Sequence, residues 1–131
     1  MPITAFYASL LAFLFLLLSL RVIAQRREAR VEIGHGESKE LLRRQRVHAN
    51  FTEYVPMALL LLAFAESLKA PSIVLHVLGL MLIVGRFAHA YALSQTPHIL
   101  RLRITGMWLT LTVIGAAAFL CFAYGGVNLI V

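Results

Sequence analysis

The chain has 131 residues, of which 60% are hydrophobic and only 14% are charged, and its mean hydropathy is +0.83. This balance excludes an ordinary soluble globular protein. The net charge of +6 would suggest nucleic acid in a soluble protein. Here the arginines cluster between apolar blocks, as in the loops of a membrane protein, so no nucleic-acid partner is expected.

Four apolar segments predict four membrane-spanning helices. Residues 1–20 carry no charge and lack the basic beginning of a secretory signal, so we expect this stretch to be retained as the first helix. The connections are short, which predicts an antiparallel up-and-down arrangement. The predicted fold is therefore all-α, a single integral membrane four-helix bundle. Its helices are expected over about residues 3–24, 39–68, 72–93 and 99–124 of the single domain 1–131.

The distribution of cations predicts the orientation. Arginines are concentrated around the first connection and at the start of the fourth segment, whereas the second connection has only Lys69, offset by Glu66. By the positive-inside rule the first and third connections are cytoplasmic, and both termini lie on the other side. The polar ends of the second, third and fourth helices then converge on the cytoplasmic side.

The second helix is too short to cross without carrying charge into the membrane. At about 1.5 Å per residue, the uncharged run between Glu53 and Glu66 spans only roughly 18 Å, against a hydrocarbon core of about 30 Å. Ionisable groups at that depth usually face a bundle interior or a wet cavity and have partners there. We therefore expect this stretch to contain the functional site, and we expect Pro56 to kink the helix.

Polar residues on two helices form the candidate site. Spacings of three and four residues place a stripe on one face of the second helix, and the third helix carries two polar residues one turn apart. Glu53 needs a cation, for which Arg46 and Arg86 are candidates. Such a pocket suits capture of a small, multiply charged molecule, because arginines bind carboxylates through bidentate hydrogen bonds. The stripe is Arg43, Arg46, Asn50 and Glu53, and the third-helix pair is Arg86 and His89.

Simpler interpretations remain for several of these residues. Arg43 by itself is typical of an anchor at the membrane surface, and for His89 a structural hydrogen bond is favoured over acid–base chemistry. Tyr91 is either an interfacial anchor or a hydroxyl donor. The one cysteine, Cys121, excludes a disulfide within the chain, and the histidines have no spacing typical of a metal site, so no metal is expected.

Two motifs together resemble the MAPEG family, the membrane-associated proteins of eicosanoid and glutathione metabolism. The second helix reads R-x-x-R-x-H-x-N-x-x-E from Arg43 to Glu53, with Pro56 following, and the third reads G-R-x-x-H-x-Y from Gly85 to Tyr91. Basic residues then open the fourth helix. The resemblance covers nearly the whole chain and is closest to the small bacterial inner-membrane members.

The resemblance implies a homotrimer in the bacterial inner membrane, with periplasmic termini and glutathione sites between subunits on the cytoplasmic side. It implies a glutathione-dependent transferase or peroxidase that acts on a lipophilic electrophile or lipid hydroperoxide. Glutathione would be the co-substrate, and membrane lipids would surround the protein. The residue expected beside the thiol is Arg103, with Arg101 second. The candidate glutathione-binding residues are Arg43, Arg46, Asn50, Glu53, Arg86, His89 and Tyr91.

The chain departs from the pattern of some family enzymes at two positions, where Ala49 replaces an arginine and Leu93 replaces a tyrosine. The family also contains a non-enzymatic lipid-binding member. A non-catalytic accessory protein that binds a lipid or thiol ligand is therefore the second hypothesis. A small-molecule or ion pathway through the bundle is the third.

Overall fold

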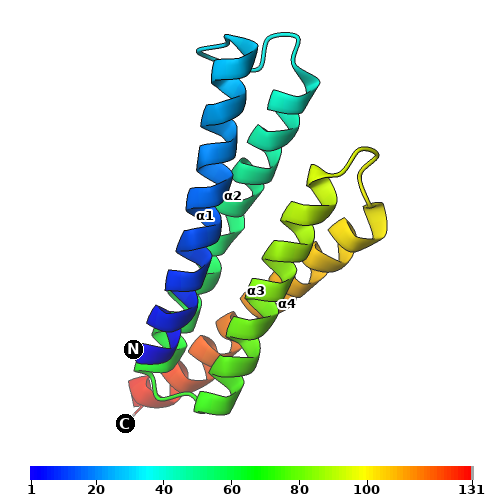
Figure 1. Cartoon of the computed structure of the whole chain (residues 1–131). Coiled ribbons are helices and arrows are strands. Elements are labelled where there is room, and N and C mark those ends of the chain that lie inside the picture. Colours follow the sequence, from blue (N-terminus) through cyan, green and yellow to red (C-terminus); the bar gives the residue numbers. More distant parts are fainter. Residues whose placement is uncertain (131) are drawn as a thin grey trace.

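The computed structural model describes residues 1–130, with side chains through residue 127, and this part of the chain forms four helices and no strand. The helices are α1 (Pro2–Ala29), α2 (Lys39–Ser67), α3 (Ser72–Ser94) and α4 (Leu100–Ile130). Each is long and apolar enough to cross a membrane. They run alternately up and down, so both chain ends lie at one end of the molecule (Figure 1). The all-α four-helix membrane bundle is therefore confirmed.

Local sequence explains the start of α2 and the end of α1. Ser38 caps α2, because its hydroxyl accepts a hydrogen bond from the backbone N–H of Leu41 at 3.1 Å. The end of α1 lies at Ala29, beyond the expected residue 24, and Arg30 follows in the left-handed conformation with φ of 54°. The polar residues there contain no helix breaker before Gly34, so the helix continues past the apolar segment.

The end of α4 differs from the expectation. The predicted end is near residue 124, but the helix continues through Gly125 and Gly126 to Ile130. A glycine costs a helix about 1 kcal/mol relative to alanine. Two glycines near the end of a 31-residue helix therefore cost too little to interrupt its hydrogen bonding.

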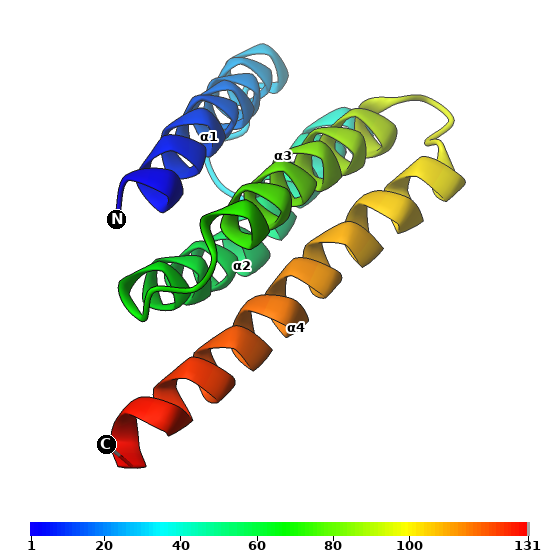
Figure 2. The same ribbon diagram turned by 90° about the horizontal axis from the view of Figure 1, so that it is seen from below.

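The helices form a rhombus rather than a closed square. α2 and α3 pack against each other in the middle, and α1 and α4 each pack against both of them. α1 and α4 do not touch within the described residues and lie on opposite sides of the central pair (Figure 2). A residue on the inner face of α3 can therefore be enclosed by α2 and α4 together.

The crossing of α3 and α4 is close because a glycine stands on each side. A Cβ added to Gly106 would lie 2.5 Å from the carbonyl oxygen of Gly85 and 2.8 Å from the backbone nitrogen of His89. Small residues at such crossings let helix backbones approach in the membrane, where dispersion contacts replace the hydrophobic effect. This crossing fixes the height and rotation of α3 relative to α4 beside Arg86.

Gly106→Ala should therefore force α3 and α4 apart, whereas Gly115→Ala should not, because a Cβ at Gly115 meets no atom within 4 Å. We expect Gly106→Ala to lower the free energy of unfolding by about 1–3 kcal/mol through overpacking. Thermal unfolding in detergent micelles measures the difference. Equal melting temperatures for the two variants would contradict the close crossing.

Candidate functional site

The centre of the candidate site is a buried guanidinium. Arg86 is 1% exposed and projects from α3 between α2 and α4. Its Nη2 donates to Oδ1 of Asn50 at 2.6 Å, and its Nη1 donates to Oγ1 of Thr110 at 3.4 Å. Its Cζ also lies 5.9 Å from the centroid of the Phe51 ring, a cation–π distance. Side chains of two helices, α2 and α4, thus hold the cation of a third.

No carboxylate neutralises this cation within the described part of the subunit. The ion pairs there join Glu40 to Arg43 and Arg44, at 3.3 and 2.9 Å, and the buried Nε of Arg86 has no hydrogen-bond partner. Glu53 is exposed, so the expectation that it pairs with Arg86 or Arg46 is not met within one subunit. Because burying an unpaired charge is costly, Arg86 is held by neutral oxygens and retains capacity to bind an anion.

The stripe on α2 divides between two environments. Asn50 is half-buried and turned toward Arg86, whereas Arg46 and Glu53 are exposed. Arg43 does not contact this centre. It pairs with Glu40 and donates to Oγ1 of Thr96 in the connection between α3 and α4. Arg46 and Glu53 therefore lie on an exposed face of α2, one turn before and one turn after Asn50, which binds the buried Arg86.

The remaining predicted residues lie at different depths. His89 is 2% exposed, and its Nδ1 is a second buried polar atom without a partner in the described structure. Tyr91 is 58% exposed and lies five residues after Arg86, on the outside of α3. Arg101 and Arg103 are exposed at the start of α4. One subunit therefore brings together Asn50 and Arg86 but leaves the proposed thiol-binding arginines on its surface.

Sequence reasoning missed two residues of this centre, Thr110 and Phe51. The Thr110 hydroxyl donates to the carbonyl of Gly106 at 2.9 Å and is fully buried. A threonine one turn after a glycine in an apolar helix is the signal that the sequence offers, because small residues are typical of close helix crossings in membranes. Phe51 gave no signal, because an aromatic residue in a membrane helix is ordinary.

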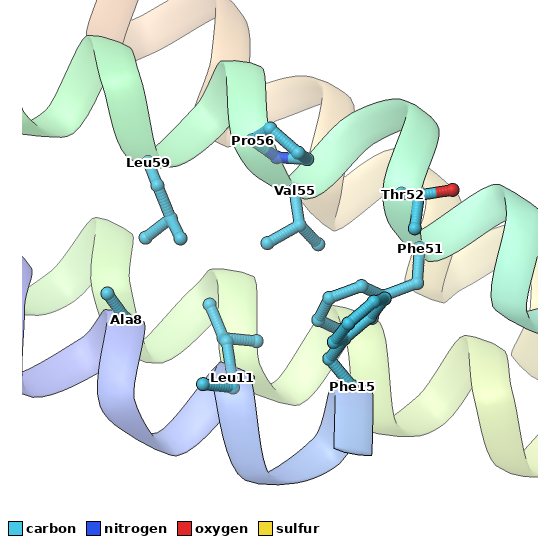
Figure 3. A pocket seen from close by; sticks show the side chains of 9 residues that line it. Ala8, Leu11, Phe15, Phe51, Thr52, Val55, Pro56 and Leu59 are labelled. Carbon is cyan, nitrogen blue, oxygen red and sulfur yellow. The ribbon is translucent and has the colours of Figure 1, made fainter. Parts of the chain in front are cut away.

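An apolar groove of about 320 Å³ lies between α1 and α2 on the other side of Phe51 (Figure 3). The rings of Phe15 and Phe51 lie at one end of it, 5.8 Å apart, and Pro56 forms part of the α2 wall. The lining residues are Ala8, Leu11, Ala12, Phe15, Phe51, Thr52, Val55, Pro56 and Leu59. Phe51 thus separates a cationic centre from an apolar groove.

The chemistry available is recognition of an anion next to apolar surface. No cluster of His, Cys, Asp or Glu that could hold a metal occurs among the residues described. The buried guanidinium offers a fixed positive charge, and the exposed Arg46, Glu53 and Arg103 offer charged groups that face away from their own subunit. A polar molecule with several charges could use both sets where this face of α2 meets another surface.

Comparison with known proteins identifies relatives along most of the chain. A sequence model of the MAPEG family matches residues 4–123. The chain is 35% identical over 105 residues to the protein named "Inner membrane protein YecN" from Escherichia coli strain K12, and equally so to its namesake from E. coli O6:H1 strain CFT073. Each match covers 80% of this chain and 79% of the relative.

Removal of the Asn50 amide tests the packing of the centre. Asn50→Ala leaves Nη2 of Arg86 buried without its acceptor, and we expect the free energy of unfolding to fall by about 1–3 kcal/mol. Asn50→Asp keeps an acceptor and adds a counter-charge, so it should retain stability. Thr52→Ala is the matched control, because the exposed Thr52 hydroxyl bonds only to the carbonyl of Ala49 in its own helix. The free energy of unfolding is measured in detergent. Equal values for Asn50→Ala and Thr52→Ala would refute this role of Asn50.

Proposed function

The chain belongs to the MAPEG family, and on this premise we propose that it is a glutathione-dependent membrane transferase or peroxidase. The observation that carries the proposal is the buried guanidinium of Arg86, held by Asn50 and Thr110 without a carboxylate. An ionisable group inside a membrane bundle is costly and is usually retained for binding or transport. Glutathione supplies the carboxylates that such a centre lacks.

The charges of glutathione match the two sets of polar residues. Its carboxylates suit Arg46 and Arg86, which can bind them bidentately, and its ammonium suits Glu53. The amide nitrogen of Asn50 remains available to a peptide carbonyl while its oxygen accepts from Arg86. We assign Arg43 and Tyr91 to the rim of the site, and the buried His89 to its floor.

The site is proposed to lie between subunits of a homotrimer. The support is that Arg46 and Glu53 are exposed on α2 and have no ion-pair partner among the described residues of their own subunit. A neighbouring subunit would cover this face and supply the remaining contacts. We place the trimer in the bacterial inner membrane, in keeping with the name of the E. coli relative.

The proposed orientation puts the site in the cytoplasmic half, where cells hold glutathione. Both chain ends lie at the end of the bundle opposite the first and third connections (Figure 1). The arginines cluster around those two connections, so the positive-inside rule makes them cytoplasmic and the termini periplasmic.

The reaction requires a thiolate near a cation. Arg103 is the first candidate to stabilise the thiolate, and Arg101 is the second, because a nearby guanidinium favours the charged form. In a transferase reaction the thiolate sulfur forms a bond to an electrophilic carbon, and the leaving group departs with its electron pair. The lipophilic co-substrate would arrive through the bilayer, which all four helices are long and apolar enough to span.

A non-catalytic lipid- or thiol-binding accessory protein is the second candidate function. It is favoured by the exposure of Arg103, which has no polar partner within the described subunit to fix its direction. A catalytic group normally needs such positioning. Turnover separates the two candidates, because both require the same binding site.

Glutathione titration of the purified protein by calorimetry, followed by a conjugation assay with 1-chloro-2,4-dinitrobenzene, tests both binding and turnover. Arg46→Ala should weaken glutathione binding roughly 10- to 150-fold, the loss typical of a hydrogen bond to a charged group. Arg103→Ala should abolish turnover while glutathione still binds. Lys39→Ala removes an exposed cation from the start of the same helix and should change neither.

Two results would separate or reject these functions. Binding without turnover across a panel of electrophiles would leave the accessory function. Absence of glutathione binding at millimolar concentration, with Arg46→Ala indistinguishable from the unmodified protein, would reject the site.

A further inference from the structure

The start of α4, which carries Arg101 and Arg103, has little support from its own subunit. Residues 100–105 are exposed apart from the half-buried Leu102, and the first buried residue of the helix is Gly106. The connection that precedes α4 also stands apart from the hairpin of α1 and α2 at this end of the bundle (Figure 1). Because helix packing does not hold these turns, the position of Arg103 depends on how the connection is held.

Backbone hydrogen bonds tie the connection to the end of α3 and to α4. The N–H of Ile99 donates to the carbonyl oxygen of Ala92 at 3.2 Å, which closes the loop. The N–H of Arg103 then donates to the carbonyl oxygen of Ile99 at 3.0 Å in the first turn of α4. A displacement of residues 94–99 is therefore transmitted to Arg103 through two consecutive hydrogen bonds.

Two arginines of the other hairpin hold this segment by their side chains, among the residues that the structure describes. Nη1 of Arg21, in α1, donates to Oγ of Ser94 at 3.1 Å. Nη1 of Arg43, in α2, donates to Oγ1 of Thr96. We call these two contacts the arginine–hydroxyl bridges. They join the hairpin of α1 and α2 to the last residue of α3 and to the connection that leads into α4.

The two arginine–hydroxyl bridges belong to one network. Oε2 of Glu40 lies 3.3 Å from Nη1 of Arg43, and its Oε1 lies 2.9 Å from Nε of Arg44. Nη1 of Arg44 in turn donates to the carbonyl oxygen of Arg21 at 3.2 Å. Hydrogen bonds with a charged donor are stronger than those between neutral groups. The network therefore fixes both guanidinium groups that hold the connection.

We propose that Arg21 and Arg43 are positioning residues, which act through Ser94 and Thr96 to place Arg103 beside the glutathione thiolate. This role rests on the proposed transferase function. It gives Arg103 the fixed direction that α4 by itself does not supply, and it requires no contact between either bridging arginine and the reacting sulfur. Loss of a bridge lets the start of α4 move, so the distance from guanidinium to sulfur is no longer fixed and the chemical step slows.

Hydrogen–deuterium exchange of the full-length protein in micelles tests the bridges without any substrate. Thr96→Val removes the acceptor of Arg43. The hydrogen-bonded amides of residues 99 and 103–105 should then exchange roughly tenfold faster, the effect of one lost hydrogen bond to a charged group. Thr96→Ser keeps the hydroxyl and should restore slow exchange. Unchanged exchange in Thr96→Val would overturn the proposal.

Ser94 and Ser67 provide a matched pair of variants. Each is the last residue of a helix, and each donates to a carbonyl of its own helix, to Ala90 at 2.6 Å and to Phe64 at 2.8 Å. In the described part of the chain, only Ser94 also accepts from an arginine. Ser94→Ala should therefore speed exchange at the start of α4, and Ser67→Ala should not. Equal exchange in the two variants would overturn the proposal for Arg21.

Steady-state kinetics with glutathione and 1-chloro-2,4-dinitrobenzene test the effect on the reaction. Thr96→Val should lower kcat roughly 10- to 100-fold, as a misplaced group does, while the Kd for glutathione stays the same. The rising limb of the pH–rate profile should move to higher pH, because a less well placed cation raises the pKa of the bound thiol. Thr96→Ser should recover both properties. A contact that only stabilises the fold would not move the pH profile.

Different results separate the positioning role from the transferase function. Faster exchange in Thr96→Val with unchanged kcat and pH profile would overturn positioning and leave the transferase. An equal loss of kcat and glutathione affinity would make Thr96 part of the binding site and overturn positioning as well. Absence of glutathione binding in the unmodified protein would reject the proposed function and this role with it. Should Thr96→Val fail to fold, Ser94→Ala undergoes the same kinetic test.

Discussion

A guanidinium buried inside a membrane bundle is the constraint on which the rest of this structure depends. Arg86 needs hydrogen-bond acceptors at a depth where water is scarce, and they come from two neighbouring helices, as Asn50 of α2 and Thr110 of α4. Thr110 reaches it because Gly85 and Gly106 let the backbones of α3 and α4 approach closely. The packing of three helices is thus tied to the requirements of one charge.

The absence of a carboxylate near Arg86 in the described structure distinguishes this centre from a structural ion pair. A buried pair is neutral and closed, whereas a cation held by an amide and a hydroxyl keeps most of its charge available. The open face of α2, with Arg46 and Glu53, lies beside it. A charged peptide that binds here would therefore supply the carboxylate that Arg86 lacks within the described subunit.

The rhombic arrangement also separates two kinds of surface. Because α1 and α4 do not meet within the described residues, each has a wide outer face. α4 presents Arg103 at its start, and α1 forms one wall of the apolar groove at Pro56. Phe51 links the two regions, since its ring contacts the Arg86 cation and also lines the groove.

The sequence alone determined the four spans, because length and hydropathy are local properties and hydrocarbon tolerates only fully hydrogen-bonded helices. It also marked Asn50 and Arg86 as polar residues at membrane depth. Only the tertiary structure decided that Asn50 turns inward while Glu53 turns outward, and that Thr110 completes the centre. A helical period places residues on one face, but the rotation of that face depends on side-chain packing between helices, here on the burial of Val47, Phe51 and Val55 of α2 in the core.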